Sequence, residues 1–314
     1  MVLREFHQPL ELEERDVPVA TDGDDVVVRV LACGVCHSDL HVVEEFFSSP
    51  LPLVLGHEIA GELPSGERVL VYAPWGCGKC RFCQATEEMI CPDSRDAGIF
   101  QDGGYAEYIF VPSRRYIYPI GDLDPIKAAP LGCGGLTAYR AVKHARPFLG
   151  PGSTALVLGA GGLGQFGLQY LRLMTDATVH AGDPVAHKRD RALELGVEHA
   201  AAPDDLEGPY TAVIDFVGSQ RSLEYAARLV DRKGIAIVVG LFGGRIPFGL
   251  GAVPHEAHFM SSIWGSRDEL AELIALAQRE HLEYTIETMP LEQAQEAHDL
   301  VRRGEALGRV VLVP

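Results

Sequence analysis

The sequence predicts a two-domain α/β protein, in which a β-rich domain comes first and a doubly wound parallel-sheet domain follows. Up to about residue 120, short β-branched or aromatic runs alternate with Gly, Pro and Asp, as in strands joined by turns. From about residue 125, short apolar strands alternate with helical patterns, which favours a parallel sheet covered on both faces. The 34 glycines suit the tight turns that such a sheet requires.

The expected elements follow this division. Strands of the first region are expected at Val26–Val30, Glu67–Tyr72 and Tyr105–Val111. A long helix is expected from Ile126 to His144. The strands that follow are expected at Ala155–Gly159, Thr178–Gly182, Ala212–Val217 and Ile235–Leu241, with helices at Gly164–Met174, Lys188–Leu195 and Ser222–Leu229. The tail from Arg267 onward shows the pattern of a helix, a strand at Tyr284–Glu287, a second helix and a last strand, Arg309–Val313.

Composition restricts the class of protein. With 47% hydrophobic and 23% charged residues, the chain has the composition of a soluble globular protein. A net charge of −17 without a basic cluster opposes a nucleic-acid partner. No apolar run reaches the roughly 18 residues of a membrane span, and the first residues lack a signal-peptide pattern. We therefore expect a cytoplasmic protein, in which seven reduced cysteines indicate metal ligands before disulfides.

Four cysteines form the most specific motif of the chain. They follow the spacing Cys77-x2-Cys80-x2-Cys83-x7-Cys91. Four thiolates in one short segment can close a tetrahedral shell around Zn²⁺, and a closed shell indicates a structural site. An iron–sulfur cluster is the alternative, because Pro92 follows the last cysteine as in bacterial ferredoxins. The seven-residue final spacing differs from the three residues of that motif, which favours structural zinc.

A second metal site is predicted from the three remaining cysteines. A catalytic zinc uses three protein ligands and leaves a fourth position open. The stretch CGVCHSDLH contains Cys33 and Cys36, and alone it does not say which of them binds. His57 adds an imidazole, with Glu58 beside it as a residue that could support a ligand. Cys36, His57 and Cys133 are therefore predicted to form a Cys2His site that faces the second domain, in a cleft between domains.

The sequence GAGGLG predicts a dinucleotide-binding turn. Gly159, Gly161 and Gly164 match G-x-G-x-x-G directly after the apolar strand TALVL and at the start of a predicted helix. The next strand ends at Asp183, 19 residues past the last glycine of the motif. A carboxylate there accepts hydrogen bonds from ribose hydroxyls and repels a 2′-phosphate, which favours NAD over NADP. The alternative is an ordinary glycine turn, with Asp183 forming a turn before Pro184.

These motifs together resemble a known family. The stretches GVCHSDLH, GHE, VYAPWGCGKCRFC, APLGCGGLTAYRA, VLGAGGLG, DFVGS and GRVVLVP span nearly the whole chain. The chain resembles the zinc-dependent medium-chain alcohol dehydrogenases, in the group of bacterial secondary-alcohol dehydrogenases. The resemblance implies a GroES-like catalytic zinc domain at 1–134 and 264–314, and a Rossmann NAD-binding domain at 135–263. It also implies two Zn²⁺ per chain, NAD(H), a small alcohol or carbonyl substrate, and a homo-oligomer, either dimer or tetramer.

The resemblance also assigns roles to individual residues. Cys36 matches the zinc ligand, so Cys33 is its buried neighbour, and Asp39 matches the residue that orients the zinc-bound imidazole. Ser38 matches the hydroxyl that contacts the substrate oxygen, and His41 the end of a proton relay through the cofactor ribose. Trp75 matches a wall of the substrate pocket. The residues implied to contact the cofactor are His37, Thr137, Gly159, Gly161, Gly162, Leu163, Gly164, Asp183, Lys188, Val217, Gly218 and Arg309.

The predicted activity is NAD-dependent oxidation of secondary or primary alcohols, with reduction of the matching carbonyls in reverse. A metal-free quinone or enone reductase of the same fold is one alternative, and it would lack Cys36, His57 and the four-cysteine segment. A non-enzymatic NADH-sensing zinc protein is the other, and it would need an inactive site. The segment from Gly61 to Val69 is shorter than is usual in the family. The remaining histidines, His298 among them, are expected to be structural or surface residues.

Overall fold

The structure, a computed structural model, describes residues 1–21 and 23–314, which form two compact units. The first unit contains both ends of the described chain and consists of Met1–Leu136, Gly265–His281 and Thr285–Pro314. The second unit consists of Thr137–Trp264 and Leu282–Tyr284.

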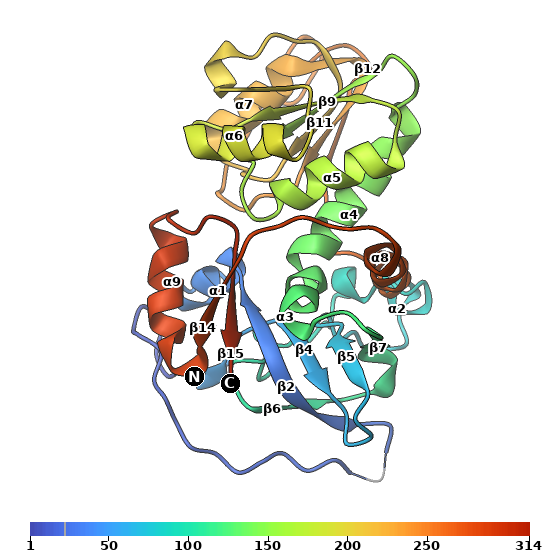
Figure 1. The fold of residues 1–314 in the computed structure, drawn as a ribbon. Coiled ribbons are helices and arrows are strands. Elements are labelled where there is room, and N and C mark those ends of the chain that lie inside the picture. The colour runs from blue at the N-terminus through green and yellow to red at the C-terminus, as the bar shows by residue number, and fades with distance from the viewer. Residues whose placement is uncertain (22) are drawn as a thin grey trace. The chain divides into compact units, whose positions relative to one another are not determined.

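A seven-stranded, mostly antiparallel sheet forms the centre of the first unit (Figure 1). Its strand order is β14-β15-β2-β4-β5-β7, and β6 pairs with the first half of β2. In this sheet Gly34 of β2 lies between Glu58 of β4 and Val311 of β15. The bounds are β2 (Val26–Val35), β4 (Glu58–Glu62), β5 (Arg68–Val71), β6 (Tyr108–Val111), β7 (Ile117–Pro119), β14 (Ile286–Pro290) and β15 (Arg309–Val313).

Short helices and a two-stranded sheet complete the first unit. Strands β1 and β3 pair antiparallel, and α1 begins two residues after β2 ends. The bounds are β1 (Val2–Leu3), β3 (Leu53–Val54), α1 (His37–Val43), α2 (Arg81–Gln84), α3 (Pro125–Ala128), α8 (Arg267–Arg279) and α9 (Ala294–Arg302).

The second unit is a six-stranded parallel sheet with the order β10-β9-β8-β11-β12-β13. From β8 the chain first adds β9 and β10 on one side and then β11, β12 and β13 on the other. The direction of the crossovers therefore reverses at β8. Right-handed crossovers put α5 and α6 on one face and α7 on the other. The bounds are β8 (Thr154–Leu158), α5 (Gly164–Met174), β9 (Thr178–Gly182), α6 (Ala186–Glu194), β10 (His199–Ala201), β11 (Tyr210–Asp215), α7 (Gln220–Leu229), β12 (Val230–Val238) and β13 (His258–Ser261).

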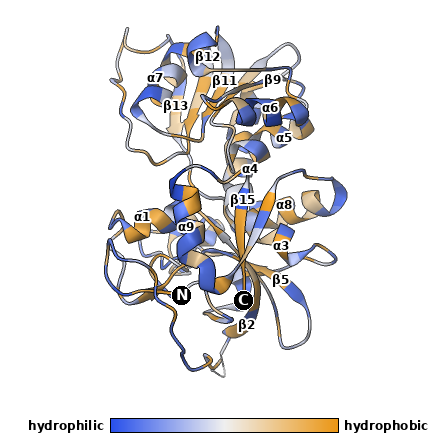
Figure 2. Cartoon of the chain, turned by 60° about the vertical axis from the view of Figure 1, so that its left-hand side comes forward, coloured by the Kyte–Doolittle hydropathy of each residue, from blue (hydrophilic) through white to orange (hydrophobic). Residues whose placement is uncertain are grey.

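Hydropathy follows this architecture. Figure 2 shows hydrophobic residues along β11 and a mostly hydrophilic α6. The last four residues of β8 and of β11 are all buried, as expected for the central strands of a covered parallel sheet. Within residues 1–21 and 23–314, the helices are all too short or too polar to cross a membrane.

The single long helix predicted after residue 125 is wrong. α3 (Pro125–Ala128) passes into a 3₁₀ turn at Ala129–Gly132, and α4 (Gly134–Ala145) starts afterwards. Pro130 cannot donate the backbone hydrogen bond that a continuous helix needs. Cys133 takes φ −134° and ψ −66°, outside the helical region. The break therefore gives Cys133 a backbone direction that a continuous helix would not have.

The shortened segment between Gly61 and Val69 is a tight β-hairpin. These two residues pair across β4 and β5, and Glu62 pairs with Arg68. The turn closes through the Leu63 N–H, which donates to the Glu67 carbonyl at 2.9 Å. The short connection therefore preserves the register of the sheet that carries Glu58.

Candidate functional site

Three predicted zinc ligands and Glu58 converge in the first unit. One ligand atom from each of Cys36, His57, Glu58 and Cys133 lies within 4.8 Å of the others. None of the four residues is more than 7% exposed. Cys36 follows β2, His57 precedes β4, and Cys133 occupies the break before α4. Two sulfur atoms, an imidazole and a carboxylate from buried residues form a donor set that suits Zn²⁺.

Asp39 fixes the orientation of the His57 imidazole. Its Oδ1 lies 3.0 Å from His57 Nδ1, and its Oδ2 accepts from the Cys36 backbone N–H at 2.8 Å. Both Asp39 and His57 are fully buried. Because Nδ1 donates to the carboxylate, Nε2 is the nitrogen that faces the two cysteines. Asp39, in the first turn of α1, thus contacts the backbone of Cys36 just before the helix and also orients the His57 ligand.

Glu58, the first residue of β4, is held by contacts with Gly134 and with Arg309 of β15. Its Oε1 accepts from the Gly134 N–H at 3.0 Å and forms an ion pair with Arg309. A side chain at Gly34, the residue paired with Glu58 across the sheet, would collide with this carboxylate. Oε2 has no hydrogen-bond partner among the residues that the structure describes. The site therefore keeps one buried carboxylate oxygen available beside the sulfur and nitrogen ligands.

Protonation in this cluster is coupled to its contacts. The Cys133 thiol donates to Cys36 and, against the effect of burial, holds the pKa of Cys36 well below its ordinary value. Burial opposes the charged form of His57, but Asp39 and Cys36 raise its pKa well above the ordinary value. Burial raises the pKa of Glu58 to about 7, although Arg309 opposes this shift. Zinc ligation needs two thiolates and a neutral imidazole, so metal binding here would release protons.

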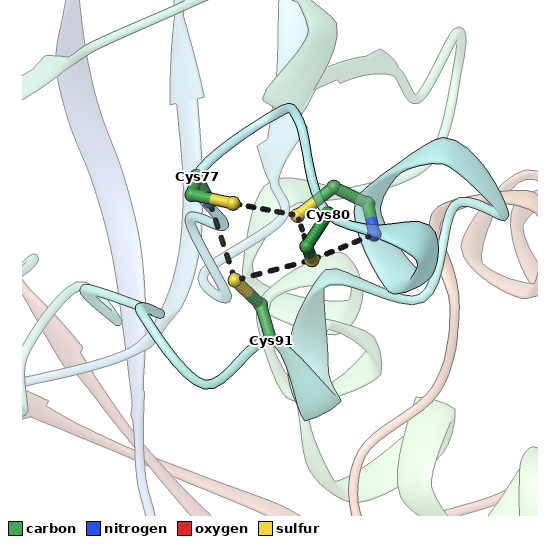
Figure 3. A group of neighbouring side chains, drawn as sticks. Cys77, Cys80 and Cys91 are labelled. Atoms are coloured by element: carbon green, nitrogen blue, oxygen red, sulfur yellow. Dashed lines mark hydrogen bonds between the residues drawn. The ribbon is translucent and has the colours of Figure 1, made fainter.

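The four-cysteine segment gathers its sulfur atoms as predicted from the spacing. One ligand atom from each of Cys77, Cys80, Cys83 and Cys91 lies within 4.8 Å of the others. Figure 3 shows three of these side chains pointing toward one another. The distances between Sγ atoms are 3.5 Å for Cys80–Cys83, 3.7 Å for Cys80–Cys91 and 4.0 Å for Cys77–Cys83. A tetrahedron with Zn–S bonds of ~2.3 Å has edges of roughly 3.8 Å, so the residues fit zinc.

Backbone N–H groups point at the sulfur atoms of this segment and so favour the thiolate form of its cysteines. The Cys77 N–H points to Cys91 Sγ at 3.4 Å, and the Cys83 N–H points to Cys80 Sγ at 3.5 Å. The backbone N–H groups of Lys79 and Cys80 lower the pKa of Cys77 to about 6. The seven cysteines, all within the described residues, form no disulfide with one another. The segment therefore offers a thiolate site rather than a disulfide.

The four-cysteine segment is anchored to the start of α8. The fully buried Glu88 pairs with Arg267 at 2.7 Å, and the Thr86 hydroxyl donates to Asp268 at 2.9 Å. The Arg267 N–H also donates to the Thr86 carbonyl at 2.9 Å. The folded cysteine segment therefore helps to hold the start of α8 in place.

The glycine turn of the second unit follows β8 and opens α5. Gly159 takes φ +88°, which favours glycine. A side chain at Gly164 would collide with the Gly159 carbonyl, so this glycine permits the close return of the helix. A Cβ atom at Gly161 would meet nothing within 4 Å. The turn therefore leaves free space where the motif predicts a pyrophosphate, and its residues fit a dinucleotide.

Asp183 directly follows β9 and bonds to this turn. The carboxylate accepts from the Ala160 N–H and from the Val185 N–H, each at 2.9 Å. It is 5% exposed. The side chain thus links the end of β9 to the glycine turn. A residue that contacts the ribose of a bound dinucleotide is expected at this position.

The other predicted site residues occupy varied surroundings. Ser38 is half-buried, with its Oγ 3.8 Å from Cys36 Sγ. His41 lies one turn later on α1, 12% exposed at the side chain and 3.6 Å from Glu44. Trp75 is buried and donates from Nε1 to the Tyr72 carbonyl at 2.9 Å. His37 is exposed, Thr137 and Gly218 are buried, and Gly162, Leu163, Lys188 and Val217 are half-buried.

Arg309 is buried, and its guanidinium contacts Glu58. The sequence predicts that Arg309 contacts the cofactor pyrophosphate, and this role stays a prediction. Arg309 is the first residue of β15, which pairs with β2 just before Cys36. Its charge therefore lies next to the candidate metal ligands.

Two family descriptions match the chain. Residues 22–122 match the alcohol dehydrogenase GroES-like domain, and residues 189–312 match the zinc-binding dehydrogenase family. An NAD-dependent alcohol dehydrogenase of Sulfurisphaera tokodaii is 34% identical, with 100% of this chain and 99% of that protein covered. An NAD-dependent alcohol dehydrogenase of Saccharolobus solfataricus is 35% identical, with 99% of each covered. The crystal structure of the alcohol dehydrogenase from Aeropyrum pernix superposes with a TM-score of 0.93 at 34% identity, covering 100% of this chain and 99% of that one.

The chain belongs to the zinc-dependent medium-chain alcohol dehydrogenases. The predicted fold class, a GroES-like domain with a Rossmann-type parallel sheet, is confirmed by these matches and by the two sheets. The resemblance stated from the motifs is confirmed as well.

Two residues of the site were not predicted as such from the sequence. The Tyr105 hydroxyl donates to Asp39 Oδ2 at 2.9 Å, and it lies 3.2 Å from His298 Nε2. Both side chains are fully buried. Tyr105 was expected inside a strand, but it lies in the loop before β6. The only signal in the sequence was the neighbouring pair Gly103-Gly104, which indicates close packing but not its partner.

Proposed function

We propose that this alcohol dehydrogenase oxidises secondary or primary alcohols with NAD and reduces the corresponding ketones and aldehydes in the reverse direction. The observation that carries the proposal is the buried convergence of Cys36, His57 and Cys133 within 4.8 Å, with Asp39 bonded to the imidazole. A structural zinc alone does not require this second donor set. The two families matched and the named activity of the full-length relatives support the same reaction class.

The proposal assigns two zinc ions to each chain. Cys36, His57 and Cys133 would hold the catalytic ion, and Cys77, Cys80, Cys83 and Cys91 the structural one. When bound, zinc supplies Lewis acidity toward the alcohol oxygen, and NAD supplies the hydride acceptor. Asp39 keeps the Nε2 of His57 available as a ligand, and Glu58 balances the charge of Arg309 beside it.

Ser38 and His41 are proposed to carry the proton away from the substrate. Residues three positions apart lie on the same face of a helix, so Ser38 and His41 lie next to each other on one face of α1. Ser38 Oγ would accept the substrate proton beside Cys36, from which it lies 3.8 Å. The imidazole of His41 would pass it on to solvent, because an imidazole can both accept and donate a proton. Trp75 would form part of the pocket wall.

The second unit is proposed to bind NAD through its glycine turn. Gly159, Gly161, Gly162, Leu163 and Gly164 would receive the pyrophosphate at the N-terminus of α5, whose free N–H groups favour an anion. Asp183 and Lys188 would contact the adenosine ribose, and Val217 with Gly218 would lie beneath the cofactor. Thr137, His37 and Arg309 would provide the remaining contacts. The first unit is accordingly proposed as the catalytic zinc domain.

Replacing Gly161 by valine tests the cofactor assignment. The fold should tolerate this change, because a Cβ atom there meets nothing within 4 Å. The KM for NAD should rise by roughly tenfold or more, because the branched side chain would occupy the space assigned to the pyrophosphate. Steady-state kinetics and thermal unfolding measure the two effects separately. An unchanged KM for NAD in a folded variant would contradict the assignment.

The function itself is tested with purified protein, NAD and a series of primary and secondary alcohols. We expect NADH to form with at least one alcohol, and we expect elemental analysis to find two zinc atoms per chain. If NADPH consumption with quinones or enones exceeds any alcohol oxidation, the reductase alternative replaces the proposal. If NADH binds without turnover of any substrate, the sensor alternative replaces it.

A homo-oligomer formed along β13 and located in the cytoplasm is also proposed. β13 is the outer strand of its sheet, and the segment before it exposes Phe248 at 74% and Leu250 at 99%. An open strand edge beside apolar side chains favours pairing with a second copy. Sedimentation velocity should show a dimer or a tetramer, and a monomer at micromolar concentration would contradict this proposal.

A further inference from the structure

A chain of buried hydrogen bonds extends from the candidate zinc ligand His57 into α9. His57 Nδ1 contacts Asp39, Asp39 accepts from the Tyr105 hydroxyl, and this hydroxyl contacts His298 Nε2. The distances along the chain are 3.0, 2.9 and 3.2 Å. All four side chains are fully buried. The residues come from four segments of the first unit that are far apart in the sequence.

We propose that Tyr105 is a positioning residue, which with His298 holds the Asp39 carboxylate in the orientation that keeps His57 available as a zinc ligand. The inference rests on the proposed function, because it requires a metal at Cys36, His57 and Cys133. It adds a further layer to that site, beyond Asp39.

The first argument is the number of donors that Asp39 needs. A buried carboxylate is strongly unfavourable unless hydrogen bonds replace its lost hydration. Asp39 receives one from His57 and one from the Cys36 backbone, and Tyr105 supplies the third. The bonds of Cys36 and Tyr105 share Oδ2, so they leave Oδ1 for His57. Without Tyr105, Oδ2 would keep a single donor and the carboxylate could rotate.

The second argument is the direction of the hydrogen bonds at Tyr105. Its one hydroxyl proton is donated to Asp39, so the contact with His298 requires a proton on His298 Nε2. The Nδ1 of His298 has no partner among the described residues, which agrees with a neutral ring carrying its proton on Nε2. Burial lowers the pKa of His298 to about 4 and so favours the same neutral form.

The third argument is the space around the Tyr105 ring. Gly56 precedes His57 and takes φ +92°, and a side chain on it would collide with this ring. The backbone of Tyr105 is held by its N–H, which donates to the Leu55 carbonyl at 2.9 Å. The ring also meets His298 edge to face, with centroids 5.7 Å apart. These contacts fix the position of the Tyr105 ring, and so they fix the position of the hydroxyl that donates to Asp39.

The test compares Tyr105→Phe with Tyr72→Phe in the zinc-loaded enzyme. Tyr72 is equally buried in the same unit, and its hydroxyl donates at 2.8 Å to the Gly265 carbonyl rather than to Asp39. The measurement is the rate at which each of the two zinc ions passes to a chromogenic chelator. We expect Tyr105→Phe to release one ion roughly 3- to 10-fold faster, somewhat less than the 10- to 100-fold loss of affinity typical of a direct ligand partner. Release of the other ion should match wild type.

Cobalt substitution gives a second readout. Co²⁺ in place of the catalytic zinc absorbs visible light with bands that depend on ligand geometry. We expect the bands to shift in Tyr105→Phe and to stay unchanged in Tyr72→Phe. If the role of Tyr105 were merely structural, Tyr105→Phe would lower thermal stability just as Tyr72→Phe does. The cobalt spectrum and the rate of zinc release would then be unchanged in Tyr105→Phe.

The pair His298→Gln and His298→Leu keeps the inference testable if Tyr105→Phe does not fold. Glutamine retains an N–H donor toward Tyr105, whereas leucine removes it. Zinc release should be close to wild type in His298→Gln and faster in His298→Leu. Equal release in these two variants and wild type overturns the inference and leaves the proposed function standing. A wild-type chain with only one zinc overturns both.

Discussion

Cys36→Ala is expected to contain one zinc per chain instead of two and to lose alcohol oxidation by roughly a thousandfold or more. The alanine removes one of three proposed ligands from a buried site, and the remaining imidazole and thiol are too few to retain the ion. The lost Lewis acid is worth several kcal/mol of transition-state stabilisation, which corresponds to this fall in rate. Elemental analysis and initial rates of NADH formation measure the two effects.

Cys33→Ala is the matched control for this experiment. Cys33 is equally a buried free thiol of β2, but it is outside the group of ligand atoms around His57. Burial raises its pKa well above the ordinary value, so it remains a neutral thiol. We expect this variant to keep two zinc ions and activity within a few-fold of wild type. Retention of both ions in Cys36→Ala would refute the assignment of the catalytic ligands.

Cys91→Ser is expected to lose the other zinc and to lower the free energy of unfolding by on the order of 4 kcal/mol. Cys91 is the last of the four ligands, and the neighbouring Glu88 is the buried partner of Arg267 on α8. Without zinc the segment loses the cross-link that presents Glu88 to this arginine. The melting temperature should fall by roughly 10 °C. Differential scanning calorimetry with zinc analysis measures both quantities.

Lys79→Ala controls for a change within the same segment. Lys79 is exposed and supplies only its backbone to the cysteine cluster. We expect two zinc ions and an unchanged melting temperature. A Cys91→Ser protein with wild-type stability would show that the cysteine segment does not support α8, and a Cys91→Ser protein with two zinc ions would exclude the four-cysteine site.

The gathering of the four cysteine sulfur atoms and the position of the glycine turn between β8 and α5 could be predicted because they depend on short-range spacing. Four cysteines within fifteen residues have few ways to be arranged, and a glycine motif between a strand and a helix has one main backbone solution. The same reasoning placed Asp183 at the end of β9, where it bonds to the glycine turn. Cys36, His57 and Cys133 are farther apart, and their convergence was predicted from the residue types together with the family resemblance.

The features that the sequence did not predict depend on tertiary packing. The break before Cys133 arises within a segment of high helical propensity, and only Pro130 marks it. The contact of Tyr105 with His298 joins residues 193 positions apart. The ion pair of Arg309 with Glu58 requires the register of three strands. No local pattern encodes such pairings, because they form only when segments far apart in the sequence pack against each other.

The two candidate zinc sites differ in how much of the chain each one needs. Cys77 to Cys91 is a single short segment, so a nascent chain can bind zinc there as soon as this segment is synthesised. Cys36, His57 and Cys133 are brought together only by the folded sheet and the broken helix after it. We therefore expect an order of metal acquisition, in which the four-cysteine segment binds its ion first and the Cys36, His57 and Cys133 site binds last. In that case an incompletely folded chain would hold zinc without activity, and catalysis would begin only after the first unit has folded.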